Sequence, residues 1–159
     1  MQGAQSDTTF YRERLWPGVW VWVGAAGAAL ALGVAYGAAF RGLVGWAVAA
    51  LVALLAGLLI WRTSPPVLVR ADALVVDRAT LPWWATGQVL VLDPAGVRQA
   101  RGLDGDPTAY SVMRPGVGPG AVVVEVTDPE DPHGTWLVGS RDAEAMARAI
   151  QEARGRLTP

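Results

Sequence analysis

Residues 15–40 read LWPGVWVWVGAAGAALALGVAYGAAF, and residues 42–61 read GLVGWAVAALVALLAGLLIW. Arg41, which lies between them, is the single charged residue of this region. A helix of about 20 residues crosses the ~30 Å hydrocarbon core of a bilayer at ~1.5 Å per residue. The two stretches therefore predict a hairpin of two transmembrane helices within residues 15–62, at about 17–37 and 43–61.

Two other interpretations of these stretches fit the sequence less well. A hairpin buried in a soluble core rarely lacks charge over two adjacent stretches of this length. A cleavable signal peptide has an apolar region of about 7–15 residues and is not followed by a second span. Here Asp7 and Glu13 interrupt the start, and the apolar region is longer. We therefore expect the hairpin to reside in the lipid bilayer.

Arginine placement predicts the orientation of the hairpin, because positive residues favour the cytoplasmic side of a membrane. Arginines flank both outer ends of the hairpin, at Arg12, Arg14, Arg62, Arg70 and Arg78, whereas the turn holds only Arg41. We expect a multi-pass protein of the cell inner (plasma) membrane with both termini cytoplasmic. Residues 1–14 then form a cytoplasmic N-terminal segment.

Aromatic residues agree with this placement, since tryptophan and tyrosine favour membrane interfaces. Tyr36, Phe40 and Trp46 would mark the side of the turn. The candidates for the cytoplasmic interface are Arg12, Arg14, Trp16, Trp20, Trp61 and Arg62. Neither span contains an acid or a histidine, so the spans offer no residues for a proton relay.

Small residues recur at every fourth position of both spans and let helix backbones approach closely. The helix-packing candidates are Ala29, Gly33, Gly37, Gly45, Ala49, Ala53 and Gly57. They predict either a specific homo-oligomer interface or contact between the two helices of one hairpin.

The second half of the chain has an ordinary polarity, with ten arginines and twelve acids in residues 62–159. Alternating apolar residues and dense prolines predict short strands within a domain over residues 66–155. The predicted strands are Pro66–Arg70, Ala73–Asp77, Thr80–Trp84, Gln88–Asp93, Ala109–Arg114, Ala121–Thr127 and Thr135–Gly139. Ser140 is a suitable N-cap for an amphipathic helix over residues 141–154.

Seven short strands followed by one helix match, in order and count, a pleckstrin-homology-like (PH-like) domain. The predicted fold is therefore a membrane α-helical hairpin followed by a small, mainly-β, PH-like domain with a C-terminal helix. Trp83 and Trp84 lie at the end of a predicted strand. Strand alternation places one of them in the core and the other in solvent, although both could instead contact the membrane interface.

Several motifs resemble those of an actinobacterial two-span membrane family of unknown function, domain of unknown function 3093. The motifs are YRERLW at 11–16, RTSPP at 62–66, ATLP at 79–82, RP at 114–115, DPEDP at 128–132 and WLVGSR at 136–141. The likeness extends from Tyr11 to about Ala153. It implies a two-span protein with a small cytoplasmic domain, and it implies no known reaction.

The sequence contains no recognisable catalytic or cofactor site. Cysteine is absent, which excludes disulfides, thiolate metal sites and cysteine nucleophiles. His133 is the sole histidine and lies in a Pro-His-Gly turn, without the partners that catalysis or zinc would require. The near-neutral net charge argues against binding to nucleic acid.

Two further patterns are better explained by turns than by ligands. Asp128, Glu130 and Asp131, even together with Asp104 and Asp106, lack the loop spacing of a calcium site. Residues 116–120, GVGPG, lack the lysine and the following helix of a phosphate loop, so we expect a hairpin connection there.

These observations favour a non-enzymatic integral membrane protein without a cofactor. Its PH-like domain would bind a protein partner at the cytoplasmic face or scaffold an envelope complex, and the residues of that partner surface cannot be named from the sequence. One alternative is recognition of lipid headgroups, although residues 62–159 hold two more acids than arginines. Another alternative is an accessory subunit of a membrane enzyme.

Overall fold

The computed structural model describes residues 8–40, 42–102, 105–114 and 116–156. Arg41, predicted in the hairpin turn, and Asp104, considered as a calcium ligand, lie outside the described residues. The chain divides into two compact units. Residues 16–64 form the hairpin unit, while residues up to 15 and from 65 onward together form the β unit.

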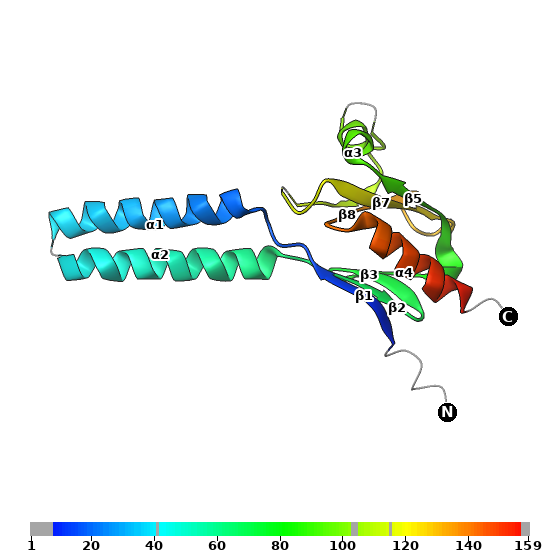
Figure 1. The fold of residues 1–159 in the computed structure, drawn as a ribbon, viewed down its shortest axis with the longest axis horizontal. Helices are drawn as coiled ribbons and strands as arrows, with labels where there is room; N and C mark the ends of the chain where they lie inside the picture. Colours follow the sequence, from blue (N-terminus) through cyan, green and yellow to red (C-terminus); the bar gives the residue numbers. More distant parts are fainter. Residues whose placement is uncertain (1–7, 41, 103–104, 115, 157–159) are drawn as a thin grey trace. The chain divides into compact units, whose positions relative to one another are not determined.

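The hairpin unit consists of two long helices, α1 (Val19–Ala39) and α2 (Gly42–Thr63), which lie side by side (Figure 1). Pro17 precedes α1, where a residue without a backbone N–H is tolerated. Pro65 follows α2, where a proline prevents the helix from continuing. Both helices are long and apolar enough to cross a membrane, and only 6% and 11% of their most apolar segments is buried. The predicted pair of long apolar helices is confirmed.

The closest contact between α1 and α2 is built from small residues. A Cβ added at Gly45 would collide with the carbonyl oxygen of Gly33 and lie 2.7 Å from the Cα of Gly37. A Cβ added at Gly33 would lie 2.8 Å from the Cβ of Ala49. Ala29, Gly33 and Gly45 are buried. The two series of small residues therefore meet each other within one hairpin at this level.

Farther along α2, the series of small residues moves away from the contact with α1. Ala53 was predicted with this group and is exposed, while a Cβ added at Gly57 would meet no atom within 4 Å. Four residues rotate a helix by about 40° more than one full turn. A series at every fourth position therefore drifts off a straight contact line. Beyond Ala49, the residues of α2 that are at least partly buried are Val52, Ala56, Gly57 and Ile60.

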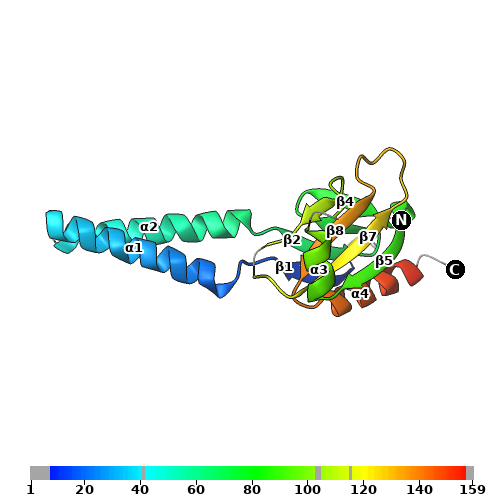
Figure 2. The ribbon, with the colours of Figure 1, turned by 90° about the horizontal axis from the view of Figure 1, so that it is seen from above.

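The β unit contains two four-stranded sheets (Figure 2). The first sheet has the order β1-β2-β3-β4, and its strands are β1 (Thr9–Arg14), β2 (Pro66–Arg70), β3 (Ala73–Val76) and β4 (Ala79–Pro82). The second has the order β5-β7-β8-β6, with β5 (Thr86–Leu92), β6 (Tyr110–Val112), β7 (Gly120–Val126) and β8 (Thr135–Ser140). All strand pairs are antiparallel except β6 with β8.

Strand β1 joins the N-terminal segment to the β unit. Arg14 pairs with Pro66, and the Leu15 N–H donates to the carbonyl oxygen of Pro65 at 3.0 Å. This strand is not predicted from the sequence, from which we expect residues 1–14 to form a separate cytoplasmic segment. The chain therefore leaves the β unit after β1 and returns at β2, its hydrogen-bonded neighbour, so the hairpin is an insertion between two adjacent strands.

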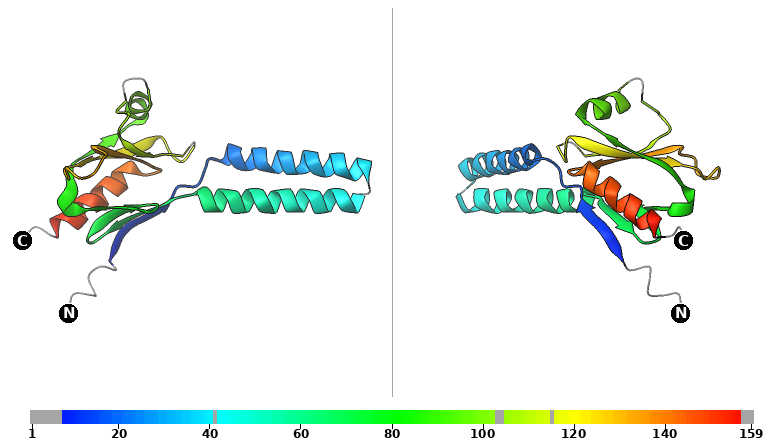
Figure 3. Two further views of the ribbon diagram at one scale, coloured as in Figure 1. Left: turned by 180° about the vertical axis from the view of Figure 1, so that it is seen from behind. Right: turned by 45° about the vertical axis from the view of Figure 1, so that its right-hand side comes forward.

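The core lies between the inner faces of the sheets and is covered by α4 (Ala143–Gly155), as the views in Figure 3 show. The fully buried aliphatic residues of the strands include Val67, Val69, Leu74, Val76, Val122, Val124 and Val138. Helix α4 contributes Ala143, Met146, Ala147 and Ile150 to the core. Burial of these side chains holds the two sheets and α4 together.

Four local structures differ from the sequence-based expectations. The predicted strand Thr80–Trp84 ends at Pro82, and Trp83–Ala85 form a single 3₁₀ turn. Trp83 is buried and its Nε1 donates to the carbonyl oxygens of Arg70 and Ala71, whereas Trp84 is exposed. One tryptophan in the core and one outside it is the expected division.

A short helix, α3 (Pro94–Ala100), was not predicted. Asp93 caps it by accepting from Gly96 N at 2.7 Å, and proline occupies the first helical position. Helix α4 begins at Ala143, later than predicted, because Asp142 rather than Ser140 is its N-cap. The GVGPG segment connects β6 to β7, which are not neighbours in the sheet, so it is not the hairpin connection that we expected.

Candidate functional site

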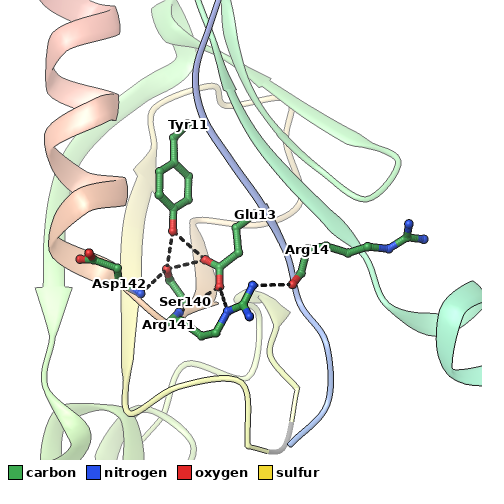
Figure 4. A network of polar contacts seen from close by, with 6 residues as sticks. All are labelled: Tyr11, Glu13, Arg14, Ser140, Arg141 and Asp142. Carbon is green, nitrogen blue, oxygen red and sulfur yellow. Dashed lines mark hydrogen bonds and ion pairs between the residues drawn. The ribbon is translucent and has the colours of Figure 1, made fainter.

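A buried carboxylate, Glu13, connects β1 to the start of α4 (Figure 4). Its Oε2 accepts from the hydroxyls of Tyr11 at 2.8 Å and Ser140 at 2.7 Å. Its Oε1 accepts from the backbone N–H of Arg141 at 3.1 Å and from the Nε of the same residue at 2.9 Å. Both oxygens are thus fully engaged, and the Glu13 side chain is 4% exposed.

Strand geometry places these groups together. Successive side chains of a strand point to opposite faces, so Tyr11, Glu13 and Leu15 face inward while Arg12 is exposed. Ser140 ends β8, and its Oγ accepts from the Asp142 N–H at 3.1 Å. Asp142 in turn accepts from Ala145 N at 2.8 Å and caps α4.

Gly118 allows a loop to pass close to this network. A Cβ at this position would collide with the Ser140 carbonyl oxygen and lie 2.7 Å from the Cα of Arg141. The GVGPG segment therefore packs against the end of β8. Gly118 allows the two backbones to approach closely, which explains this glycine without a phosphate-binding role.

The network keeps Glu13 ionised. Burial raises the pKa of the Glu13 carboxyl by removing water, but hydrogen bonds from Ser140, Arg141 and Tyr11 outweigh it and lower the pKa below its ordinary value of 4.5. The same burial raises the pKa of Tyr11 to about 12, with the adjacent Glu13 charge contributing. Glu13 and Arg141 form an ion pair within this network.

This arrangement fixes structure and is poorly suited to proton transfer. A general acid or base needs a pKa near the working pH and access to a substrate. Glu13 has a lowered pKa, is buried and already accepts four hydrogen bonds. The guanidinium of Arg141 also donates to the Arg14 carbonyl oxygen at 3.3 Å. The network therefore ties the strand that precedes α1 to the beginning of α4.

Sequence reasoning did not identify Glu13 as a partner of Ser140 and Arg141. The available signal was the alternation of Tyr11, Arg12, Glu13 and Arg14, which is a strand pattern with an acid on its inner face. The two motifs at 11–16 and 136–141, which carried the family resemblance, meet in this network.

The acidic turn and His133 border a groove of about 440 Å³ between β4 and β6. Asp128 accepts from Glu130 N at 2.9 Å, and Asp131 accepts from His133 N at 2.8 Å, as the turn interpretation predicts. His133 Nδ1 lies 2.8 Å from the Thr108 carbonyl oxygen. Among the described residues, no group of three or more histidine or acidic side chains is arranged to hold a metal ion.

The predicted interface residues are divided between the two units. Arg12 and Arg14 lie on β1, while Arg62 lies in the last turn of α2. Trp20 and Trp61 are 80% and 52% exposed, and Trp16 lies beside Trp22 with ring centroids 6.2 Å apart. Their assignment to a membrane interface stays a prediction.

A protein-family match covers most of the chain. Residues 10–150 match the family described as protein of unknown function (DUF3093). The chain belongs to this family. No curated protein and no solved structure matches it. The match begins at Phe10 and so includes β1, the hairpin and most of the β unit. For this DUF3093 protein, the family match thus extends over both units, and the family's description assigns no activity.

Proposed function

We propose that this protein is a non-enzymatic membrane anchor that presents a PH-like domain at the cytoplasmic face. The domain binds a protein partner there or scaffolds an envelope complex. The observation that carries the proposal is the insertion of two apolar, membrane-length helices between paired strands of one folded unit. Such an insertion attaches the domain to the bilayer at two adjacent points.

The pairing of β1 with β2 supports the proposal that both ends of the hairpin lie on the same side of the membrane. The Leu15 N–H donates to the Pro65 carbonyl oxygen, so the chain must enter and leave the hairpin on the same side of the membrane. The arginines at Arg12, Arg14 and Arg62 favour the cytoplasm as that side.

The PH-like assignment rests on architecture. Two packed four-stranded sheets and a C-terminal helix over their shared core resemble that domain class. The second sheet departs from a fully antiparallel arrangement, because β6 pairs with β8 in parallel. Because folds of this kind serve many functions, the fold alone does not assign a role, and partner binding is the part of the proposal that the cross-linking experiment tests.

Site-specific photo-cross-linking in native membranes tests the proposal. A cross-linking amino acid is placed at exposed positions of the β unit, Arg98, Glu130 and Arg148, and at Leu54 of α2 as a control. We expect at least one β-unit position to give a reproducible protein product that Leu54 does not give. A β unit that cross-links to no protein at any position would refute partner binding. A product that is a membrane enzyme would identify the chain as its accessory subunit.

A further inference from the structure

The groove beside the acidic turn lies between edge strands of the two sheets. Strands β4 and β6 are both edge strands. Ala79 and Thr80 line the groove from β4, whereas Tyr110 lines it from β6 and Trp136 from β8. Its volume of about 440 Å³ falls within the ~300–1,000 Å³ that is typical of ligand sites. The groove is therefore large enough to hold a side chain of another molecule.

The groove carries negative charge. The residues that line it include three acids and no arginine, and the acids are Asp128, Glu130 and Asp131, between β7 and β8. Asp128 and Asp131 each accept a backbone N–H within the turn, which leaves their charge in place. Among the described residues, none of the three acids forms an ion pair with an arginine. The described chain therefore does not neutralise this charge.

Three aromatic rings line the groove together with these acids, and we call them the aromatic cluster. The Tyr110 ring centroid lies 4.7 Å from that of Trp136 and 5.5 Å from that of His133. Burial raises the pKa of the Tyr110 hydroxyl, and the nearby charge of Asp77 contributes, so a fourth acid adds negative potential at this ring. The face of an aromatic ring attracts cations, and the planar guanidinium of arginine also stacks on it. The aromatic cluster is thus suited to a flat cation.

Trp136 adds a polar group that no described residue engages. The residue is 3% exposed, and its Nε1 is a buried donor without an acceptor in the part of the chain that the structure describes. Buried donors in folded proteins nearly always have an acceptor. An unpaired donor on a ring that lines a groove favours a ligand that brings an acceptor, and a peptide backbone offers its carbonyl oxygen. This observation is independent of the acidic turn and points to the same groove.

We propose that the groove binds an arginine in a basic segment of the protein partner. The guanidinium stacks on the aromatic cluster and pairs with carboxylates of the acidic turn, because its fixed fork of donors matches their oxygens. A carbonyl oxygen of the same segment accepts from Trp136 Nε1. Anionic lipid headgroups would be repelled by the same acids. The inference rests on the proposed function, since it names the chemistry of the partner that the β unit binds.

Peptide binding to the full-length protein tests this inference. The protein is incorporated into nanodiscs of phosphatidylcholine, which has no net charge, and empty nanodiscs provide the background. Fluorescence anisotropy measures the binding of a labelled peptide in which arginine alternates with glycine. Matched peptides carry lysine or citrulline in place of arginine, and citrulline keeps the shape of the side chain without its charge.

Two double variants separate the groove from the other acids of the β unit. Glu130→Gln with Asp131→Asn removes two carboxylates from the groove, and each amide keeps an oxygen that can accept a hydrogen bond. Glu144→Gln with Glu152→Gln is the matched control, because it changes the net charge equally at exposed acids of α4. The indole N–H resonance of Trp136, assigned through its loss in Trp136→Phe, reports on the groove directly.

We expect the arginine peptide to bind about tenfold more tightly than the citrulline peptide and to shift the Trp136 indole resonance. Affinity should fall about threefold for each carboxylate removed from the groove and stay unchanged in the control variant. The proposal would be overturned by lysine or citrulline peptides that bind as tightly as the arginine peptide, by equal losses in both double variants, or by binding that leaves the Trp136 resonance in place. The other tryptophan resonances verify that each variant stays folded.

Photo-cross-linking in native membranes distinguishes failure of this inference from failure of the proposed function. The cross-linking amino acid is placed at Thr80, an exposed residue of the groove, and at Arg148 on α4. A protein product at Thr80 that disappears with Glu130→Gln and Asp131→Asn supports the inference. A product at Arg148 that persists in this variant, with none at Thr80, would keep the partner and overturn its binding in the groove.

Two other outcomes concern the identity of the occupant. Peptide binding without a protein product at any position of the β unit would refute partner binding, while the selectivity of the groove for guanidinium would stand. A cross-linked product that consists of two copies of this chain would replace the partner by self-association and overturn the proposal.

Discussion

Glu13 shows how one buried charge can specify the path of the chain. A carboxylate removed from water is costly unless donors replace the lost solvent. Here four donors do so, and three of them come from Ser140 and Arg141, at the opposite end of the sequence. The cost of leaving Glu13 unpaired therefore favours the one arrangement in which β1 lies beside the start of α4.

Replacement of Glu13 by glutamine should destabilise the β unit. The amide removes the charge and presents an N–H₂ group to neighbours that are themselves donors. We expect a loss of about 1–3 kcal/mol in the free energy of unfolding, measured by urea denaturation with tryptophan fluorescence. Glu144→Gln is the control, because Glu144 forms an exposed pair with Arg148 at 3.6 Å and should change stability little. Equal effects of both substitutions would contradict the role given to the network.

The same network predicts a pH dependence. Burial opposes the charge of Glu13, but its hydrogen bonds hold the pKa below 4.5, so the folded protein binds this proton less tightly than the unfolded chain does. The stabilisation is present above pH 4.5 and disappears as the pH falls through the lowered pKa. The stability difference between the wild type and Glu13→Gln should therefore shrink on acidification, when urea denaturation is repeated at pH 7, 5 and 3. A constant difference would argue against an ionised Glu13.

At the level of elements, α1 and α2 owe their close approach to residues without side chains. The backbones meet where Gly33 and Gly37 face Gly45. In the bilayer that we propose for these helices, lipid offers no hydrophobic drive for helix association, so close van der Waals contact of this kind is the available stabilisation.

Gly45→Ala should therefore loosen the hairpin. The added methyl group would collide with the Gly33 carbonyl oxygen, whereas a methyl group at Gly27 would meet no atom within 4 Å. Spin labels at the exposed residues Val23 and Leu58 report the distance between the helices by pulsed electron resonance in lipid nanodiscs. We expect a longer or broader distance distribution for Gly45→Ala and an unchanged one for Gly27→Ala. Identical distributions would show that the glycine contact does not hold the helices together.

The elements that could be predicted are those with a strong internal pattern. The apolar helices, the Val122 and Val124 face of β7 and the apolar stripe of α4 follow from composition and periodicity alone. Strand β1 was missed because its inner face carries Tyr11 and Glu13, whose burial depends on donors from residues far away in the sequence. Local patterns cannot reveal a charge that becomes acceptable only through distant partners.

At the scale of the whole molecule, the β unit is built from two separate segments of the chain. Residues 9–14 supply an edge strand and Glu13, while residues 66–156 supply the rest. The motifs at 11–16 and 136–141 could be noticed in the sequence, but their contact could not, because the hydrogen bonds of Glu13 with Ser140 and Arg141 form only in the tertiary fold.

A shortened chain should test this two-segment unit. Residues 8–15 are joined to residues 65–156 by an Asn-Gly turn, which suits a two-residue connection between antiparallel strands. We expect a soluble protein with dispersed amide resonances in its NMR spectrum. Residues 65–156 alone should give a poorly dispersed spectrum, because β2 and Arg141 lose their partners. Equal dispersion for both chains would mean that β1 is dispensable.

Labelling in intact cells should place the turn between α1 and α2 outside the cell and the β unit inside. The chain has no native cysteine, so Ala39→Cys and Ala95→Cys each introduce a single thiol at an exposed position. An impermeant maleimide should react with the former, at the end of α1, and not with the latter, on α3. Both should react after lysis, which controls for accessibility. The reverse pattern would invert the orientation.

The insertion of the hairpin also orders events during biosynthesis. Strand β1 leaves the ribosome first, but its partner β2 follows only after residues 15–65 have been made. Until then β1 has an unpaired edge and Glu13 has no donor from Ser140 or Arg141. The sheet can close only after both apolar helices have been synthesised. In the membrane anchor that we propose, a mature β unit is thus assembled later than its anchor.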